Sequence, residues 1–206
     1  NLGMLLVERG DDEAVPVLSG LVREYETLHM AMSAAAAQSN LSLYHLDRGE
    51  REAFERLSNA SAKVFASAKH HQHLAALDLN IAYFELGAGK YTAAWDALWR
   101  AGACFPIQFE SGLDLEGAIL HAWLAFVRGE RAQVTAGLQV LWQEAELDDS
   151  LLGPMVIQLI KLMTAIIGED DTGAAALIDK HQAPATVTFR VLSRAMVNYM
   201  QPSSAS

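Results

Sequence analysis

Three neighbouring histidines are the residues best suited to metal chemistry. His70, His71 and His73 precede Asp78, and on a helix His70 and His73 share one face because they stand three residues apart. Zinc binds such imidazole nitrogens only when further ligands converge in space. The sequence has a single cysteine, Cys104, so no pair of thiols can complete a site. We therefore expect these histidines to lie at a helix end, and we expect neither a metal nor a cofactor.

Motifs for nucleotide binding or catalysis are incomplete in this sequence. Residues 87–90 (Gly-Ala-Gly-Lys) match part of a phosphate-binding loop, but Phe84 stands where its first glycine belongs, and Tyr91 replaces its Ser or Thr. The sequence also lacks a Gly-x-Ser-x-Gly elbow, a His-Glu-x-x-His motif and an EF-hand loop. We therefore predict that the chain is not an enzyme and has no catalytic residues.

Acidic clusters lie at residues 11–13, 148–149 and 169–171. Paired carboxylates can act as general acid and base, or bind calcium, but nothing in the sequence places two of these groups in one cleft, and their spacing does not match a calcium loop. Each cluster falls at a predicted helix start, where acidic side chains cap free N–H groups and interact favourably with the helix dipole. We therefore expect helix caps.

The four tryptophans are candidates for a ligand groove, since aromatic rings provide binding energy at low entropic cost. Trp95 and Trp99, however, stand four residues apart on one predicted helix, which is typical of core packing. Trp123 belongs to a column of apolar residues described below. We expect these three residues in the core, and Trp142 remains a candidate for the groove.

A repeat with a period of 39 or 40 residues positions these side chains. Glycines recur at positions 10, 49, 89, 129 and 168, each after an apolar segment with helical spacing. The positions six and three residues before each glycine are apolar in all five copies, and this spacing puts both columns on one face of a helix. The glycine itself is typical of a helix end. A second periodic segment follows the glycine, for example over residues 51–69 and 91–104.

The pattern predicts an all-α protein: a right-handed α-solenoid of about five helix-turn-helix repeats plus a terminal helix. We expect one repeat domain over residues 1–200 and a flexible tail or linker over residues 201–206. Residues 186–191 form a β-branched run after Pro184, at the point where a sixth unit would begin, so we predict a helix there. Residues 151–168 are apolar but contain Pro154, Gln158 and Lys161, which favours a buried helix over a membrane span.

The repeat resembles the tetratricopeptide family. Residues 1–3 and 8–14 are similar to that family's Asn-Leu-Gly opening and its Gly-to-Ala turn. A fuller match covers residues 74–106 through Ala82, Tyr83, Gly87, Lys90, Tyr91, Ala94, Leu98, Ala101 and Pro106. The family's usual period is 34, and lengthened repeats such as these are similar to those in the sensor superhelix of maltose-regulator-type bacterial transcription activators.

This resemblance implies a concave groove lined mainly by the first helix of each repeat, which would receive a peptide, a protein partner or a small-molecule inducer. The candidate residues share a position on those first helices at or near the side that the apolar columns leave open. They are Asn40, Tyr44, His45, Asn80, Phe84, Glu85 and His121. We expect a noncatalytic sensor or interaction domain of a bacterial transcription regulator. The alternative is a scaffold or chaperone-like subunit of a multiprotein or secretion assembly.

Composition sets further limits. The 206 residues are 51% hydrophobic and 19% charged, which excludes a disordered chain. The net charge of -10 and the absence of a basic cluster argue against direct nucleic-acid binding by this segment. With one cysteine and no signal peptide, we predict a cytoplasmic protein that does not enter a membrane. Because the chain starts inside a repeat, we expect a fragment of a larger protein, whose open ends other domains cover or through which copies form a homo-oligomer.

Overall fold

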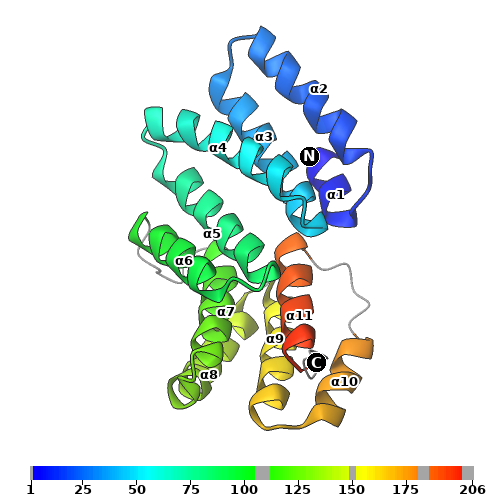
Figure 1. Ribbon diagram of the computed structural model, residues 1–206, viewed down its shortest axis with the longest axis vertical. Helices are drawn as coiled ribbons and strands as arrows, with labels where there is room; N and C mark the ends of the chain where they lie inside the picture. The colour runs from blue at the N-terminus through cyan, green and yellow to red at the C-terminus, as the bar shows by residue number, and fades with distance from the viewer. Residues whose placement is uncertain (1, 105–111, 149–151, 181–185, 201–206) are drawn as a thin grey trace, which may run out of the picture. The chain divides into compact units, whose positions relative to one another are not determined.

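The computed structural model describes residues 2–104, 112–148, 152–180 and 186–200, and these residues form eleven α-helices without a strand (Figure 1). The predicted all-α class is confirmed. The helices are α1 (Leu2–Arg9), α2 (Ala14–Thr27), α3 (Ala31–Arg48), α4 (Arg51–Ser67), α5 (His71–Gly87), α6 (Tyr91–Cys104), α7 (Gly112–Val127), α8 (Arg131–Leu147), α9 (Leu152–Ile167), α10 (Asp171–Lys180) and α11 (Val187–Met200).

The chain divides into two compact units. The first unit comprises Asn1–Pro106 and Pro184–Val191, and the second comprises Ile107–Ala183 and Leu192–Ser206. Helices α1 to α6 therefore belong to the first unit and α7 to α10 to the second, while α11 contributes its first turn to one unit and its remainder to the other. The single repeat domain expected over residues 1–200 stays a prediction, and the expected tail over residues 201–206 lies outside the described residues.

Within each unit, helices pack on their neighbours along the chain (Figure 1). In the first unit this holds from α1 through α6, and α3 also contacts both α1 and α5. In the second unit α7, α8, α9 and α10 pack in succession, and α7 contacts α9. Contacts between neighbours and between alternate helices are consistent with stacked helical pairs.

One turn geometry, which we call the left-handed cap, ends most of the helices. The central residue of this turn has a positive φ. Its N–H group donates to the carbonyl three residues before it, and the N–H group of the following residue donates to the carbonyl five residues before that residue. At Gly49 (φ 68°) the bonds run from Gly49 N to Leu46 O (3.1 Å) and from Glu50 N to His45 O (3.0 Å). Because this cap satisfies the last carbonyls in two residues, the next helix starts at once, at Arg51.

Among the described residues, the left-handed cap recurs about every twenty residues from position 10 to position 89, and again at positions 129 and 169. Glycine occupies it at positions 10, 49, 89 and 129, whereas His29, Lys69 and Glu169 adopt it without glycine, with φ of 57°, 54° and 59°. Gly168 directly follows the last residue of α9, as the column predicts, but it is not the left-handed residue of that turn. Glu169 takes that conformation, and its N–H group bonds to Ile166 O.

The cost of a left-handed side chain gives a stability test. Gly49→Ala is expected to lower the free energy of unfolding by about 1–2 kcal/mol, the usual penalty for an L-residue in this region. A Cβ at Gly49 meets no atom within 4 Å, so the cost is conformational and not steric. Lys69→Gly removes the same penalty and should raise stability by up to about 1 kcal/mol. Urea denaturation followed by circular dichroism measures both, and changes of the same sign would contradict the assignment.

Most positions of the predicted apolar columns are buried, whereas Met4, Leu43 and Ala165 are half-buried. Three residues before the glycines, Val7, Leu46, Leu86 and Phe126 are buried, and Trp123 is fully buried. Trp99 contradicts its prediction, because it is 62% exposed on the outward side of α6.

The apolar segment near residue 160 is a helix, α9, with a buried face. No helix among the described residues is both long and apolar enough to cross a membrane.

The acidic clusters act as caps in part. Asp170 Oδ1 accepts a bond from Gly173 N (2.9 Å) at the start of α10. Asp11 Oδ1 accepts one from Glu13 N (2.9 Å) in the turn before α2, and the start of α2 itself has no side-chain cap. Asp12 instead binds side chains of α3, as described below. Asp149 lies outside the described residues.

Candidate functional site

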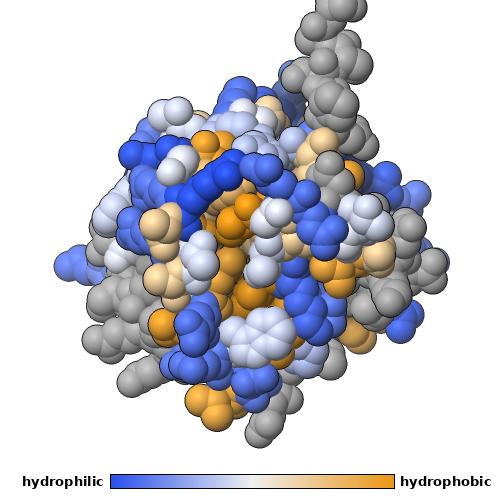
Figure 2. All heavy atoms as spheres, turned by 90° about the horizontal axis from the view of Figure 1, so that it is seen from below, coloured by the Kyte–Doolittle hydropathy of each residue, from blue (hydrophilic) through white to orange (hydrophobic). Residues whose placement is uncertain are grey.

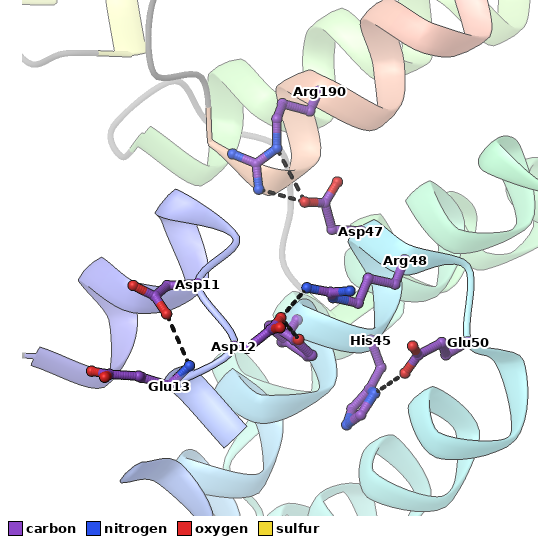
Figure 3. Close-up of polar contacts among 9 residues, drawn as sticks. Asp11, Asp12, Glu13, His45, Asp47, Arg48, Glu50 and Arg190 are labelled. Atoms are coloured by element: carbon purple, nitrogen blue, oxygen red, sulfur yellow. Dashed lines mark hydrogen bonds and ion pairs between the residues drawn. The ribbon is translucent and has the colours of Figure 1, made fainter. Parts of the chain in front are cut away.

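Two of the predicted groove residues on α3 are engaged in contacts within the first unit (Figure 3). Tyr44 is buried, and its hydroxyl donates a hydrogen bond to Asp12 Oδ1 (2.6 Å). The guanidinium of Arg48 pairs with the same carboxylate and lies 4.5 Å from the Tyr44 ring centroid. Burial raises the pKa of Tyr44, and the bond to Asp12 adds to this shift. The rings of Tyr44 and His45 form a T-shaped pair, and His45 Nδ1 lies 2.6 Å from Glu50 Oε2.

Two of the predicted residues on α5, Phe84 and Glu85, contact Arg51, the first residue of α4. Phe84 is buried, and its ring stacks on Phe54 with centroids 4.4 Å apart. Arg51 lies over the Phe84 ring (4.7 Å) and donates two hydrogen bonds to Glu85, from Nη1 to Oε1 (2.8 Å) and from Nη2 to Oε2 (3.0 Å). These bonds hold the pKa of Glu85 below its usual value. A third bond joins Arg51 to Glu55 (2.7 Å).

The structure therefore brings Phe84 and Glu85 together, and it makes ring neighbours of Tyr44 and His45. Asn40 and Asn80 are half-buried on α3 and α5. His121 belongs to α7 of the second unit, where burial lowers its pKa. Ligand contact by all seven residues stays a prediction.

The histidine cluster lies where the sequence places it, at the start of α5. His70 Nδ1 and His73 Nδ1 are 2.7 Å apart, and the His73 ring packs against Phe65. Burial lowers the pKa of His73, and the neighbouring His70 adds to this effect. In the part of the chain that the structure describes, no group of three or more His, Cys, Asp or Glu residues is arranged to hold a metal ion.

A polar site that the candidate residues did not include lies at the C-terminal ends of α1, α3 and α5. We call Glu8, Asp47 and Gly87 the anchor site, because they contact the first turn of α11. Arg190 of α11 donates to Asp47 Oδ2 from Nη2 (2.7 Å) and Nε (3.2 Å), as Figure 3 shows, and to Glu8 O from Nη1 (2.7 Å). Val187 N donates to Glu8 Oε2 (3.1 Å). Burial raises the pKa of Glu8.

The anchor site follows the repeat. Glu8, Asp47 and Gly87 each stand two residues before a glycine of the column, and the equivalent positions of the later caps hold Val127 and Ile167. The residue type at this position therefore changes along the sequence from acidic or small to apolar. This change could have marked the anchor site before the structure was known. The first turn of α11 thus bonds to residues of α1 and α3, and the expectation that α11 opens a sixth unit stays a prediction.

The second unit contains a cavity of ≈ 220 Å³ between α9, α10 and α11. It is lined by Gln158, Leu159, Leu162, Leu177, Ser193, Arg194, Val197 and Asn198. The Ser193 hydroxyl is buried and has no hydrogen-bond partner among the residues that the structure describes. On the face seen from below, where the α9–α10 turn lies, Figure 2 shows apolar side chains gathered in a recess with a hydrophilic rim.

A more open furrow runs between α8 and α9 of the same unit, with a volume of ≈ 510 Å³. Trp142 lines it, as the sequence allowed, together with Gln139 and Gln143. Lys161 Nζ lies 5.6 Å from the Trp142 ring centroid.

Comparison with protein-family models, with curated proteins and with solved structures finds no match to this chain. The tetratricopeptide resemblance therefore rests on the residue pattern and on the helical pairs.

Proposed function

We propose that this chain is a noncatalytic ligand-binding module, and that it serves as the sensor or interaction domain of a bacterial transcription regulator. In this proposal the helical pairs form a right-handed tetratricopeptide-like solenoid. The recurring left-handed cap supports it, since one turn repeated about every twenty residues from position 10 to position 89, and again at positions 129 and 169, generates similar pairs. The observation that carries the function is the cavity between α9, α10 and α11.

The cavity favours a small and mostly apolar ligand. Its volume of ≈ 220 Å³ is below the roughly 300–1,000 Å³ of pockets for drug-sized molecules. Leucine and valine side chains supply apolar contact, and the lining residues Gln158 and Asn198 offer polar groups. A buried hydroxyl without a partner costs about 1–3 kcal/mol, so a ligand that hydrogen-bonds to Ser193 recovers part of this cost. The chemical class is a neutral molecule with one hydrogen-bonding group.

Thermal unfolding in the presence of indole and of hexanol tests the proposal. Both probes are expected to raise the melting temperature, because a ligand that binds only the folded state stabilises it by about 2.7 kcal/mol at one hundred times its Kd. Val197→Phe fills the cavity and should abolish the shift. The matched control is Val140→Phe, since Val140 is exposed on α8 and does not line the cavity.

Ser193→Ala separates binding from folding in this test. The variant keeps the cavity but removes the hydroxyl, so it should bind hexanol more weakly than the wild type while binding benzene equally well. The proposal fails if neither probe shifts the wild type, or if Val197→Phe responds as the wild type does.

A further inference from the structure

We propose that the anchor site is a receptor for the first turn of a helix with arginine at its fourth residue. In this proposal α11 is an internal ligand, and a helix of another protein with the same pattern displaces its first turn. This inference concerns the first unit and goes beyond the proposed function, which rests on the cavity of the second unit. Its basis is the set of contacts between the anchor site and residues 187–191.

The polar contacts select the start of a helix. The first N–H groups of a helix have no partner within it, and a carboxylate near them is favourable. Glu8 supplies that carboxylate to Val187 N (3.1 Å), and the backbone carbonyl of Glu8 at the end of α1 accepts from Arg190 (2.7 Å). One residue thus recognises both the helix start and the arginine one turn later.

The arginine is recognised by geometry as well as by charge. Asp47 accepts two bonds from the guanidinium of Arg190, at 2.7 and 3.2 Å. The side chains are only 16% and 26% exposed, respectively, so water screens the pair less than it screens a surface pair. A lysine offers no fork of N–H groups and would not bond to Asp47 and to the Glu8 carbonyl in the same way.

Apolar contacts complete the pattern. Val187, Phe189 and Val191 of the internal ligand are at most 3% exposed. Gly87 allows the close approach, because a Cβ at that position would lie 3.2 Å from Val191 Cγ1. The contacts therefore specify arginine at the fourth position of the helix and an apolar residue at the fifth, where Val191 lies against Gly87.

The internal ligand occupies the first unit over a short segment. Only the segment Pro184–Val191 belongs to the first unit, whereas the remainder of α11 belongs to the second. A competing helix therefore has to replace one turn and its contacts with two acidic residues. The partner helix must carry an arginine that hydrogen-bonds to the Glu8 carbonyl and to Asp47, and a valine that packs against Gly87.

Fluorescence anisotropy with a labelled peptide of residues 186–200 tests this proposal on the full chain. The wild type should bind the peptide weakly, because its own α11 competes for the anchor site. Arg190→Ala in the chain weakens this internal competitor and should tighten peptide binding by about tenfold or more, as expected when the competent fraction rises. Asp47→Ala added to that variant should abolish the gain. A peptide with alanine in place of its arginine should not bind.

Charge reversal keeps the test decisive if a variant is poorly folded. Asp47→Arg in the Arg190→Ala chain should bind a peptide that carries aspartate at its arginine position, and it should not bind the native peptide. Circular dichroism checks that each chain is helical. Equal binding of both peptides to every chain would overturn the proposal, as would no binding to Arg190→Ala. Dimers of the wild type that Arg190→Ala abolishes would also overturn it, since they would indicate exchange between copies. The test of the cavity, which compares the indole shift of the wild type with that of Val197→Phe, does not depend on any of these results.

Discussion

Trp123→Ala is expected to lower the free energy of unfolding of the second unit by about 3–5 kcal/mol, the usual cost of truncating a buried tryptophan. The side chain is fully buried, and its ring contacts Phe126 of α7 and Tyr199 of α11, with centroids 5.5 and 5.4 Å apart. Alanine would leave a void where these elements meet, and the surrounding helices would lose packing that they cannot fully replace.

Two matched variants test whether the loss of stability in Trp123→Ala comes from the burial of this side chain. Trp99→Ala should change stability by no more than about 0.5 kcal/mol, because Trp99 is largely exposed. Trp123→Phe should cost less than the alanine variant, since the indole Nε1 has no hydrogen-bond partner in the described part of the chain. Urea denaturation followed by circular dichroism measures all three, and equal losses at positions 99 and 123 would contradict the assignment of the core.

Arg51→Met should destabilise the first unit by about 1–2 kcal/mol, toward the lower end of the usual range for a bond to a charged group. Methionine keeps much of the contact with the Phe84 ring but leaves Glu85, which is 14% exposed, without its two bonds from the guanidinium. We expect a loss of stability at the lower end of this range because Arg51 itself is 34% exposed, so water screens its charge. Glu55→Gln is the control, because Glu55 is half exposed and its bond to Arg51 is on the surface.

The effect of Arg51→Met should depend on pH. Arg51 lowers the pKa of Glu85 below 4.5, so the ionised pair contributes stability above that value. This contribution is lost as the pH falls through the folded-state pKa, where Glu85 takes up a proton. The difference in unfolding free energy between wild type and variant should therefore be full at pH 7 and narrow below pH 4.5. A difference that stays constant between pH 7 and pH 3 would show that the ion pair contributes nothing.

Local pattern was sufficient to predict the helices and most of their ends. Apolar residues three apart and a glycine after them are properties of neighbouring residues, and α4, α6 and α9 begin within about two residues of the expected positions. The same reasoning missed the caps at His29 and Lys69 because only glycine marks a left-handed residue in a sequence. It treated Trp99 and Trp123 alike because both occur at helical spacing, although only one faces a neighbouring helix.

By itself, the sequence determined an all-α chain of repeated helical hairpins, because helix periodicity and turn chemistry act within a few residues. Only the tertiary structure decided which side chains meet. Glu8 and Arg190 are 182 residues apart, and Asp47 and Arg190 are 143 apart, so no local period encodes their contact. The same limit applies to the cavity between α9, α10 and α11, since its volume depends on how three helices pack and on no single segment.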